Sequence, residues 1–174
     1  MGTSMASVSF RRTDSMNRPD MRLRVEAMYQ DVKGLVSNLD QGNNGCAIVS
    51  PHGDQETLLQ NMAEKISALL GDYAVFCICA DSDFALLELY HKGMLLEKSV
   101  IGALELVDEI DELSQVELPD PALWKPLLLD AGNLDALQQA FTEDEGFAED
   151  QLLTISELTG IPIFDETLVY GDDF

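Results

Sequence analysis

Cysteine is scarce in this sequence and the apolar runs are short. Each of these two shortages excludes a class of protein. Three cysteines in 174 residues do not form the even set of a disulfide framework. The longest apolar runs, such as residues 73–80, fall far short of the roughly 18 residues that a membrane-spanning helix needs. No apolar signal-peptide segment follows Arg11 and Arg12. We therefore expect a soluble, cytoplasmic protein with reduced cysteines.

Basic residues are also scarce: 10 Lys and Arg face 32 Asp and Glu, a formal net charge of −22. Residues 1–33 hold six basic and four acidic residues, so residues 34–174 hold four basic and 28 acidic residues, a net charge of −24. Such a polyanion repels nucleic acid and anionic membranes and attracts cations. The charge therefore predicts a basic protein partner, with no direct binding to nucleic acid or membrane.

The motifs of common catalytic and nucleotide-binding sites are missing as well. His52 and His91 are the only histidines, and neither belongs to an HExxH motif or accompanies paired metal-binding cysteines. The serines lack a GxSxG context, and Gly42 and Gly45 belong to neither a GxGxxG motif nor a P-loop. We therefore predict no catalytic residue, no cofactor and no metal, and expect that the protein is not an enzyme.

Two short clusters could bind a metal, and the first keeps an alternative open, an enzyme that uses carboxylates with a metal. Asp81 and Asp83 flank Ser82 at an expected tight turn, where two carboxylates could bind a divalent cation or act as an acid and base pair. We favour a turn, because short polar side chains accept local backbone hydrogen bonds there. Cys77 and Cys79 point to the same side of an expected strand and could suit a soft metal, but such pairs more often fill a core.

The composition is that of a globular chain, with 46% apolar and 24% charged residues. Residues 1–20 are rich in Ser, Met, Arg and Thr and show no sustained apolar period. We expect them to form a disordered leader whose deletion changes the melting temperature little. Residues 21–174 are expected to form a single domain.

Apolar periodicity predicts the elements of the first hundred residues. Helices are expected at residues 21–39 and 55–70, the second ended by Gly71, and strands at residues 46–49, 73–80, 84–90 and 94–101. The last three strands are separated by tight turns and so predict an antiparallel meander. These elements indicate an α+β fold: an antiparallel sheet of about four strands, in the order strand, helix and meander, with helices packed on one face.

The C-terminal half is expected to be helical and acidic. Residues 103–174 hold 19 acidic residues and one basic residue, Lys125. An apolar stripe under a face of carboxylates predicts a helix at residues 103–113, and short helices are expected at residues 133–141 and 147–158. A charge run is often only a solvated face, but a net charge of −22 destabilises the fold through self-repulsion. We therefore infer that the acidic half has a binding role.

Carboxylates spaced along helices can imitate the phosphates of nucleic acid or complement a surface of Arg and Lys. Trp124 and Phe147 could supply aromatic anchors, although each is a common type of core residue. The residues predicted to bind the partner are Glu105, Asp108, Glu109, Glu112, Trp124, Glu143, Asp144, Glu145, Glu149 and Asp150.

The segment 46–101 resembles an uncharacterised family of small acidic bacterial α+β proteins. The resemblance is carried by Ala80-Asp81-Ser82-Asp83-Phe84, by Leu89-Tyr90-His91-Lys92-Gly93 and by the helix at 55–70 with its Lys65-Ile66-Ser67. Downstream, Trp124, Phe147-Ala148-Glu149-Asp150 and Leu158-Thr159-Gly160-Ile161 are similar to the C-terminal helices of that family. The resemblance covers about two-thirds of the chain, implies a sheet-and-helix fold and transfers no catalytic residue. By analogy it implies the role of an inhibitor or immunity factor.

Three functions are consistent with the sequence. The first is a non-enzymatic, immunity-like inhibitor that occludes the basic, nucleic-acid-binding type of surface of a toxin, nuclease or defence effector. The second is a structural or adaptor subunit of a cytoplasmic assembly, whose charge keeps it soluble until it docks. The third is the carboxylate and metal-dependent enzyme. Salt separates the first two, because charge-driven binding weakens steeply with salt and apolar docking does not.

Overall fold

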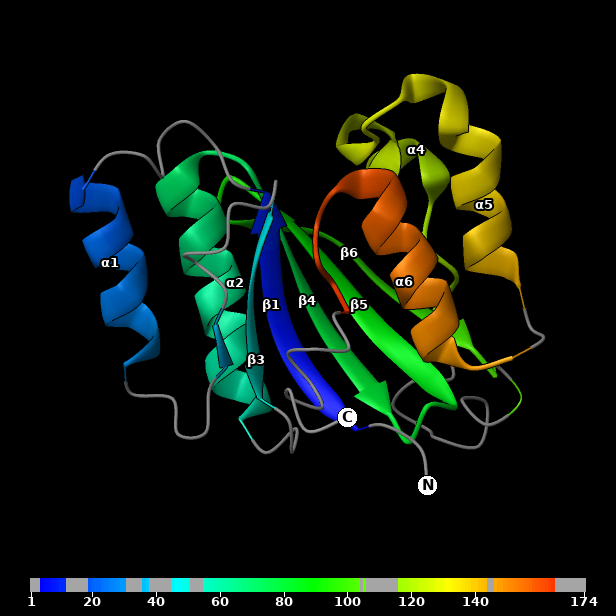
Figure 1. Ribbon diagram of the computed structural model, residues 1–174, viewed down its shortest axis with the longest axis horizontal. Helices are drawn as coiled ribbons and strands as arrows, with labels where there is room; N and C mark the ends of the chain where they lie inside the picture. Colours follow the sequence, from blue (N-terminus) through cyan, green and yellow to red (C-terminus); the bar gives the residue numbers. More distant parts are fainter. Residues whose placement is uncertain are drawn as a thin grey trace.

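A six-stranded antiparallel sheet with helices on both faces forms the centre of the molecule (Figure 1). The computed structural model describes residues 4–11, 19–30, 36–37, 45–50, 55–103, 105, 116–143 and 146–164. The strands are β1 (Met5–Arg11), β2 (Val36–Ser37), β3 (Gly45–Ser50), β4 (Tyr73–Ala80), β5 (Phe84–His91) and β6 (Met94–Gly102), in the order β2-β3-β1-β4-β5-β6. The α-helices are α1 (Pro19–Tyr29), α2 (Glu56–Leu70), α4 (Pro121–Trp124), α5 (Leu134–Thr142) and α6 (Ala148–Thr159).

The α+β class and the order strand, helix and meander are confirmed. β3, α2 and the hairpins β4–β5 and β5–β6 follow one another as expected, and Gly71 ends α2 in the left-handed conformation with φ 63°. The β5–β6 turn has positive φ at both Lys92 (51°) and Gly93 (82°), which matches the right-handed twist of the flanking strands. Local signals were therefore sufficient for this part of the fold, and the sheet contains two strands beyond the expected four.

The prediction that residues 1–20 form a disordered leader is wrong for Met5–Arg11, which form β1 in the middle of the sheet. Its residues pair with β3 on one side and with β4 on the other, and every side chain from Met5 to Phe10 is buried. The segment alternates apolar residues with Ser7 and Ser9, whose small side chains fit under the opposite layer. The domain therefore includes β1 and does not begin at residue 21.

The helix expected at residues 21–39 is too long. The described part of α1 ends at Tyr29, and residues 36–37 form the short strand β2. Val36 and Ser37 lie opposite Val49 and Ile48 of β3, so backbone pairing in the sheet replaces helical pairing there. Valine is β-branched and favours such a position.

Helices cover both faces of the sheet, not one. In β4, Val75, Cys77 and Cys79 face the core under α4, α5 and α6, while Ala74 and Phe76 face the core under α1 and α2. Figure 1 shows these two helical layers on opposite sides of the strands. The continuous apolar run of β4 is the pattern of a strand buried on both faces, because alternation with polar residues is needed only where one face meets water.

Gly102 closes β6 at a position that no larger residue fits. Its φ is +101°, and a Cβ atom there would lie 2.5 Å from the Asp83 carbonyl oxygen and 2.9 Å from the Phe84 Cα. We expect Gly102→Ala to lower the free energy of unfolding by about 1–3 kcal/mol, measured by urea denaturation. Gly71→Ala is the control, because its φ is also positive but nothing lies within 4 Å of the added Cβ. Equal losses in the two variants would contradict the close approach of Gly102 to the β4–β5 turn.

Candidate functional site

Two acidic segments far apart in the sequence meet at one end of the molecule. The β4–β5 turn carries Asp81 and Asp83, both exposed, and lies against the first turn of α6. The Ala148 amide donates to the Ser82 carbonyl at 2.9 Å, and the Ser82 hydroxyl donates to Glu149 Oε2 at 3.1 Å. We call the carboxylates of Asp81, Asp83, Glu149 and Asp150 the acidic end. Only the tertiary structure unites these carboxylates, which the sequence placed in two separate clusters.

The negative charge of the acidic end acts on a neighbouring thiol. Burial, followed by the charges of Glu149 and Asp83, raises the pKa of Cys79 to about 12. Burial, followed by the charge of Cys79, also raises the pKa of the fully buried Cys77 thiol. Both cysteines are therefore neutral core residues at ordinary pH, and neither is an activated nucleophile.

The other candidate ligands do not converge. Among the residues that the structure describes, no group of three or more His, Cys, Asp or Glu could hold a metal ion. The His91 ring is half-buried and stacks on Tyr73, with ring centroids 4.1 Å apart. His52 lies outside the described residues, as does the side chain of Cys46.

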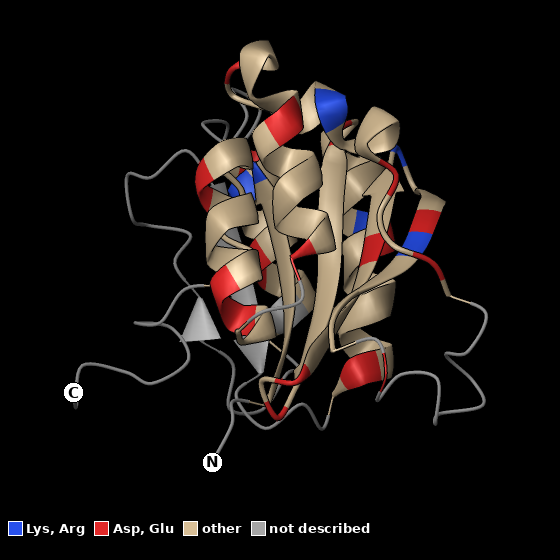
Figure 2. Cartoon of the chain, turned by 90° about the vertical axis from the view of Figure 1, so that its right-hand side faces the viewer, with Lys and Arg blue, Asp and Glu red and all other residues tan. Residues whose placement is uncertain are grey.

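Four of the predicted partner-binding carboxylates lie in the part of the chain that the structure describes. Glu105, Glu143 and Asp150 are exposed, and Glu149 is half-buried because it accepts the Ser82 hydroxyl. The remaining predicted carboxylates lie outside the described residues; they are Asp108, Glu109, Glu112, Asp144 and Glu145. Figure 2 shows the face formed by β6 and the helices α4 to α6, with acidic residues on several helices and turns.

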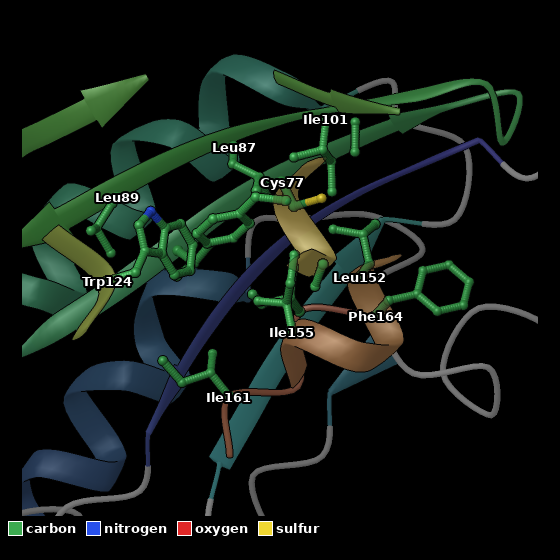
Figure 3. Close-up of a cluster of buried hydrophobic side chains, with 14 of the residues drawn as sticks. Cys77, Leu87, Leu89, Ile101, Trp124, Leu152, Ile155, Ile161 and Phe164 are labelled. Carbon is green, nitrogen blue, oxygen red and sulfur yellow. The ribbon is translucent and has the colours of Figure 1, made fainter. Parts of the chain in front are cut away.

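The prediction that Trp124 binds the partner is wrong, because its side chain is 0% exposed. Its indole packs edge-on against Phe141, with ring centroids 5.5 Å apart, and its Nε1 donates to Glu97 Oε1 at 2.9 Å. Figure 3 shows the ring within the apolar cluster between the sheet and the C-terminal helices. Phe147, the other aromatic anchor considered, is 58% exposed at the start of α6. A partner could therefore reach Phe147 but not Trp124.

Sequence reasoning missed a buried carboxylate on β5. Glu88 is only 4% exposed, and its oxygens accept the Tyr90 hydroxyl at 2.8 Å and the Gln60 side-chain amide at 3.1 and 3.3 Å. Burial, followed by the hydrogen bond and charge of Glu88 and by the charge of Glu64, raises the pKa of Tyr90. This network joins α2 to β5. In the sequence, Glu88 is the one Asp, Glu, Lys or Arg within the apolar run of β5, which is the signal that could have found it.

A second missed feature is the apolar start of β6. Met94 is 69% exposed, Leu95 is 50% exposed and Leu96 is 39% exposed. The sequence predicts a strand at residues 94–101 but gives no sign that its first three side chains are exposed. Its exposure follows from its place at the end of the sheet order.

Fold and surface together define an acidic α+β protein with a sheet between two helical layers. The chain matches no protein-family model, and no curated protein and no solved structure matches it. The resemblance to an uncharacterised bacterial family therefore stays a prediction from the sequence. Within the described ranges, every helix is too short or too polar to cross a membrane.

Proposed function

We propose that this chain is a non-enzymatic, cytoplasmic binding protein whose acidic surface occludes a basic surface of a partner protein. The partner's surface is of the kind that binds nucleic acid, as in a toxin, nuclease or defence effector, and the chain acts as an inhibitor or immunity protein. The observation that carries the proposal is the union of the β4–β5 turn with α6 at the acidic end, because it concentrates charge from separate segments at one place.

The helical layer extends this charge beyond the acidic end. Its exposed carboxylates in the described residues are Glu105, Glu117, Asp120, Asp130, Asp135, Glu143, Asp150 and Glu157. Lys125 is the basic residue that residues 103–174 contain, so little positive charge offsets them. Fields of one sign accelerate the encounter with a surface of opposite sign and weaken with salt. A charge of this size also repels itself, a cost that a binding role explains.

Reversing acidic charges on this face is expected to weaken binding to a cationic probe. We choose Glu143→Lys with Asp150→Lys and an immobilised arginine-rich peptide as the probe. Exposed ion pairs are individually weak, so we expect roughly tenfold weaker binding at low salt, with the difference shrinking as salt rises. Surface plasmon resonance over a salt series measures both effects. A further variant with Glu105, Asp108, Glu109 and Glu112 changed to Lys tests the other predicted acidic segment.

The matched control reverses Glu56 and Glu64, two exposed carboxylates of α2 on the opposite face. Glu56 lies in the first turn of α2 as Asp150 lies in the first turn of α6, so both double variants change the net charge equally and each reverses one carboxylate at a helix start. We expect the control to bind nearly as well as the parent chain. Equal weakening in both would show that only net charge matters, and would contradict a binding surface on the α4 to α6 face.

A second function, a structural or adaptor subunit, is favoured by one observation, the exposed apolar start of β6. An adaptor that docks through apolar side chains would hold its partner with little dependence on salt. Binding that persists unchanged from low to high salt would therefore move the assignment to an adaptor.

A further inference from the structure

β6 is the last strand of the sheet, and its two halves have different neighbours. Near its end, the Val100 amide donates to the Glu117 carbonyl at 3.0 Å, and Ser99 forms an isolated parallel β-bridge with Glu117. In the part of the chain that the structure describes, no strand pairs with the outer edge of its first half. That half carries the exposed side chains of Met94, Leu95 and Leu96. We call these three side chains the β6 patch. Met94 and Leu95 lie opposite His91 and Tyr90, so their side chains leave the strand on opposite faces of the sheet and make its open edge apolar on both. Exposed apolar side chains gathered in this way are a feature of interaction sites.

Carboxylates border the β6 patch on the side of α4. Glu97 lies on the sheet face that α4 covers, where its oxygens accept the Trp124 indole N–H at 2.9 Å and the Asp120 amide at 2.7 Å. These bonds hold the start of α4, with the exposed carboxylate of Asp120, beside β6. Glu117 is exposed next to Ser99. Figure 2 views the molecule from this side, so β6 and the acidic helical layer belong to one face.

Lysines border the patch elsewhere. Lys92 lies in the β5–β6 turn, and Lys98 lies opposite Glu88 and so on the sheet face that α2 covers. A uniformly cationic segment would meet these two lysines and be repelled. An occupant with apolar groups at its centre and cations on one side only would meet the carboxylates of Glu117 and Asp120 instead.

We propose that the β6 patch is the apolar centre of the partner-binding surface, and that the partner presents an apolar segment flanked by Arg or Lys on the side that meets Glu117 and Asp120. This proposal rests on the proposed function and deepens it. Interfaces commonly owe most of their affinity to a few buried apolar anchors, while the charged rim sets the rate and the choice of partner. The carboxylates alone would give fast and weak capture, and the patch would supply slow dissociation.

A second copy of this chain is a poorer occupant. Each copy has a net charge of −22, so charge opposes association of two copies. In addition, the pairing of β5 with β6 shifts register between Leu89 and Tyr90, and Lys98 lies on the edge strand. Bulges and lysines on edge strands are features that hinder pairing between the edges of two sheets.

The test compares two immobilised peptides, one of arginine alone and one in which arginine alternates with leucine. The triple variant Met94→Gln, Leu95→Gln and Leu96→Gln removes the patch, and Leu23→Gln on α1, where Leu23 is 64% exposed, is the control. We expect the parent and the control to bind the leucine-containing peptide roughly tenfold more tightly than the arginine peptide at elevated salt. The triple variant should lose this preference and keep its salt-sensitive binding at low salt. Thermal melting confirms that each variant is folded.

The outcomes separate the two proposals. A folded triple variant that keeps the preference for leucine overturns the role of the patch and leaves the proposed function standing. A parent chain that binds neither peptide at low salt overturns the proposed function and this inference with it. A parent dimer, seen by sedimentation and abolished in the triple variant, would assign the patch to a second copy and also overturn the inference.

Discussion

Deletion of residues 1–11 is expected to abolish the cooperative unfolding transition of this protein. β1 lies between β3 and β4 and pairs with both, so its removal takes a pairing partner from each of these strands and divides the sheet. The strand also anchors the C-terminal layer: the Ser7 hydroxyl donates to the Ile163 carbonyl at 3.2 Å, and the Arg11 guanidinium donates to the carbonyls of Leu127 and Thr159. We expect the free energy lost with these contacts to exceed the free energy of unfolding of a typical domain, roughly 5–15 kcal/mol. Circular dichroism during heating and urea titration measures the loss.

The control for this deletion removes residues 1–3, which precede β1. That shorter deletion keeps all of β1 and the Ser4 hydroxyl that accepts the Asp81 amide, so we expect it to leave the transition midpoint nearly unchanged. A cooperative transition of the longer deletion near that of the full chain would contradict the central position of β1. It would instead support the disordered leader that the composition of residues 1–20 predicted.

Replacing Trp124 by alanine is expected to lower the free energy of unfolding by about 3–5 kcal/mol. The change empties a buried site beside Phe141 and leaves the Glu97 carboxylate without the indole N–H that it accepts. Urea denaturation monitored by circular dichroism measures the loss without relying on tryptophan fluorescence. Trp124→Phe keeps an aromatic ring and loses the hydrogen bond, so its smaller loss separates the two contributions.

Phe147→Ala is the matched control, because Phe147 is aromatic and 58% exposed. We expect it to change stability by less than about 0.5 kcal/mol, as surface substitutions usually do. The two variants also distinguish a core role from a binding role. Unchanged stability of Trp124→Ala, combined with loss of peptide binding, would restore Trp124 as a partner-binding residue and contradict its buried position.

Elements whose signals are local could be predicted from the sequence. Helix α2 repeats its apolar residues on one face and ends at Gly71, which adopts the left-handed conformation that glycine tolerates best. The meander could be predicted because short polar segments interrupt its apolar runs. In the structure the β4–β5 turn has positive φ at Asp81 and Ser82. In each case the residues that decide the structure are sequence neighbours.

The candidate site was less predictable. Exposed carboxylates such as Glu143 and Asp150 were identified because charged residues avoid the core. The burial of Trp124 contradicts its predicted binding role, and the exposure of Met94 was not predicted, because a sequence pattern treats these two large apolar side chains alike. Their difference depends on position: Met94 is on the last strand of the sheet, and Trp124 lies beneath α5.

The sequence by itself determined the net charge of −22, the α+β class, helix α2 and the three-stranded meander, because composition and short-range periodicity are properties of the chain. Only the tertiary structure decided that β1 enters the sheet between β3 and β4, that helices cover both faces, and that the β4–β5 turn joins α6 to form the acidic end. The physical reason is the same for all three. Strand pairing and layer packing are contacts between distant residues, and their energies depend on which partners the rest of the fold makes available.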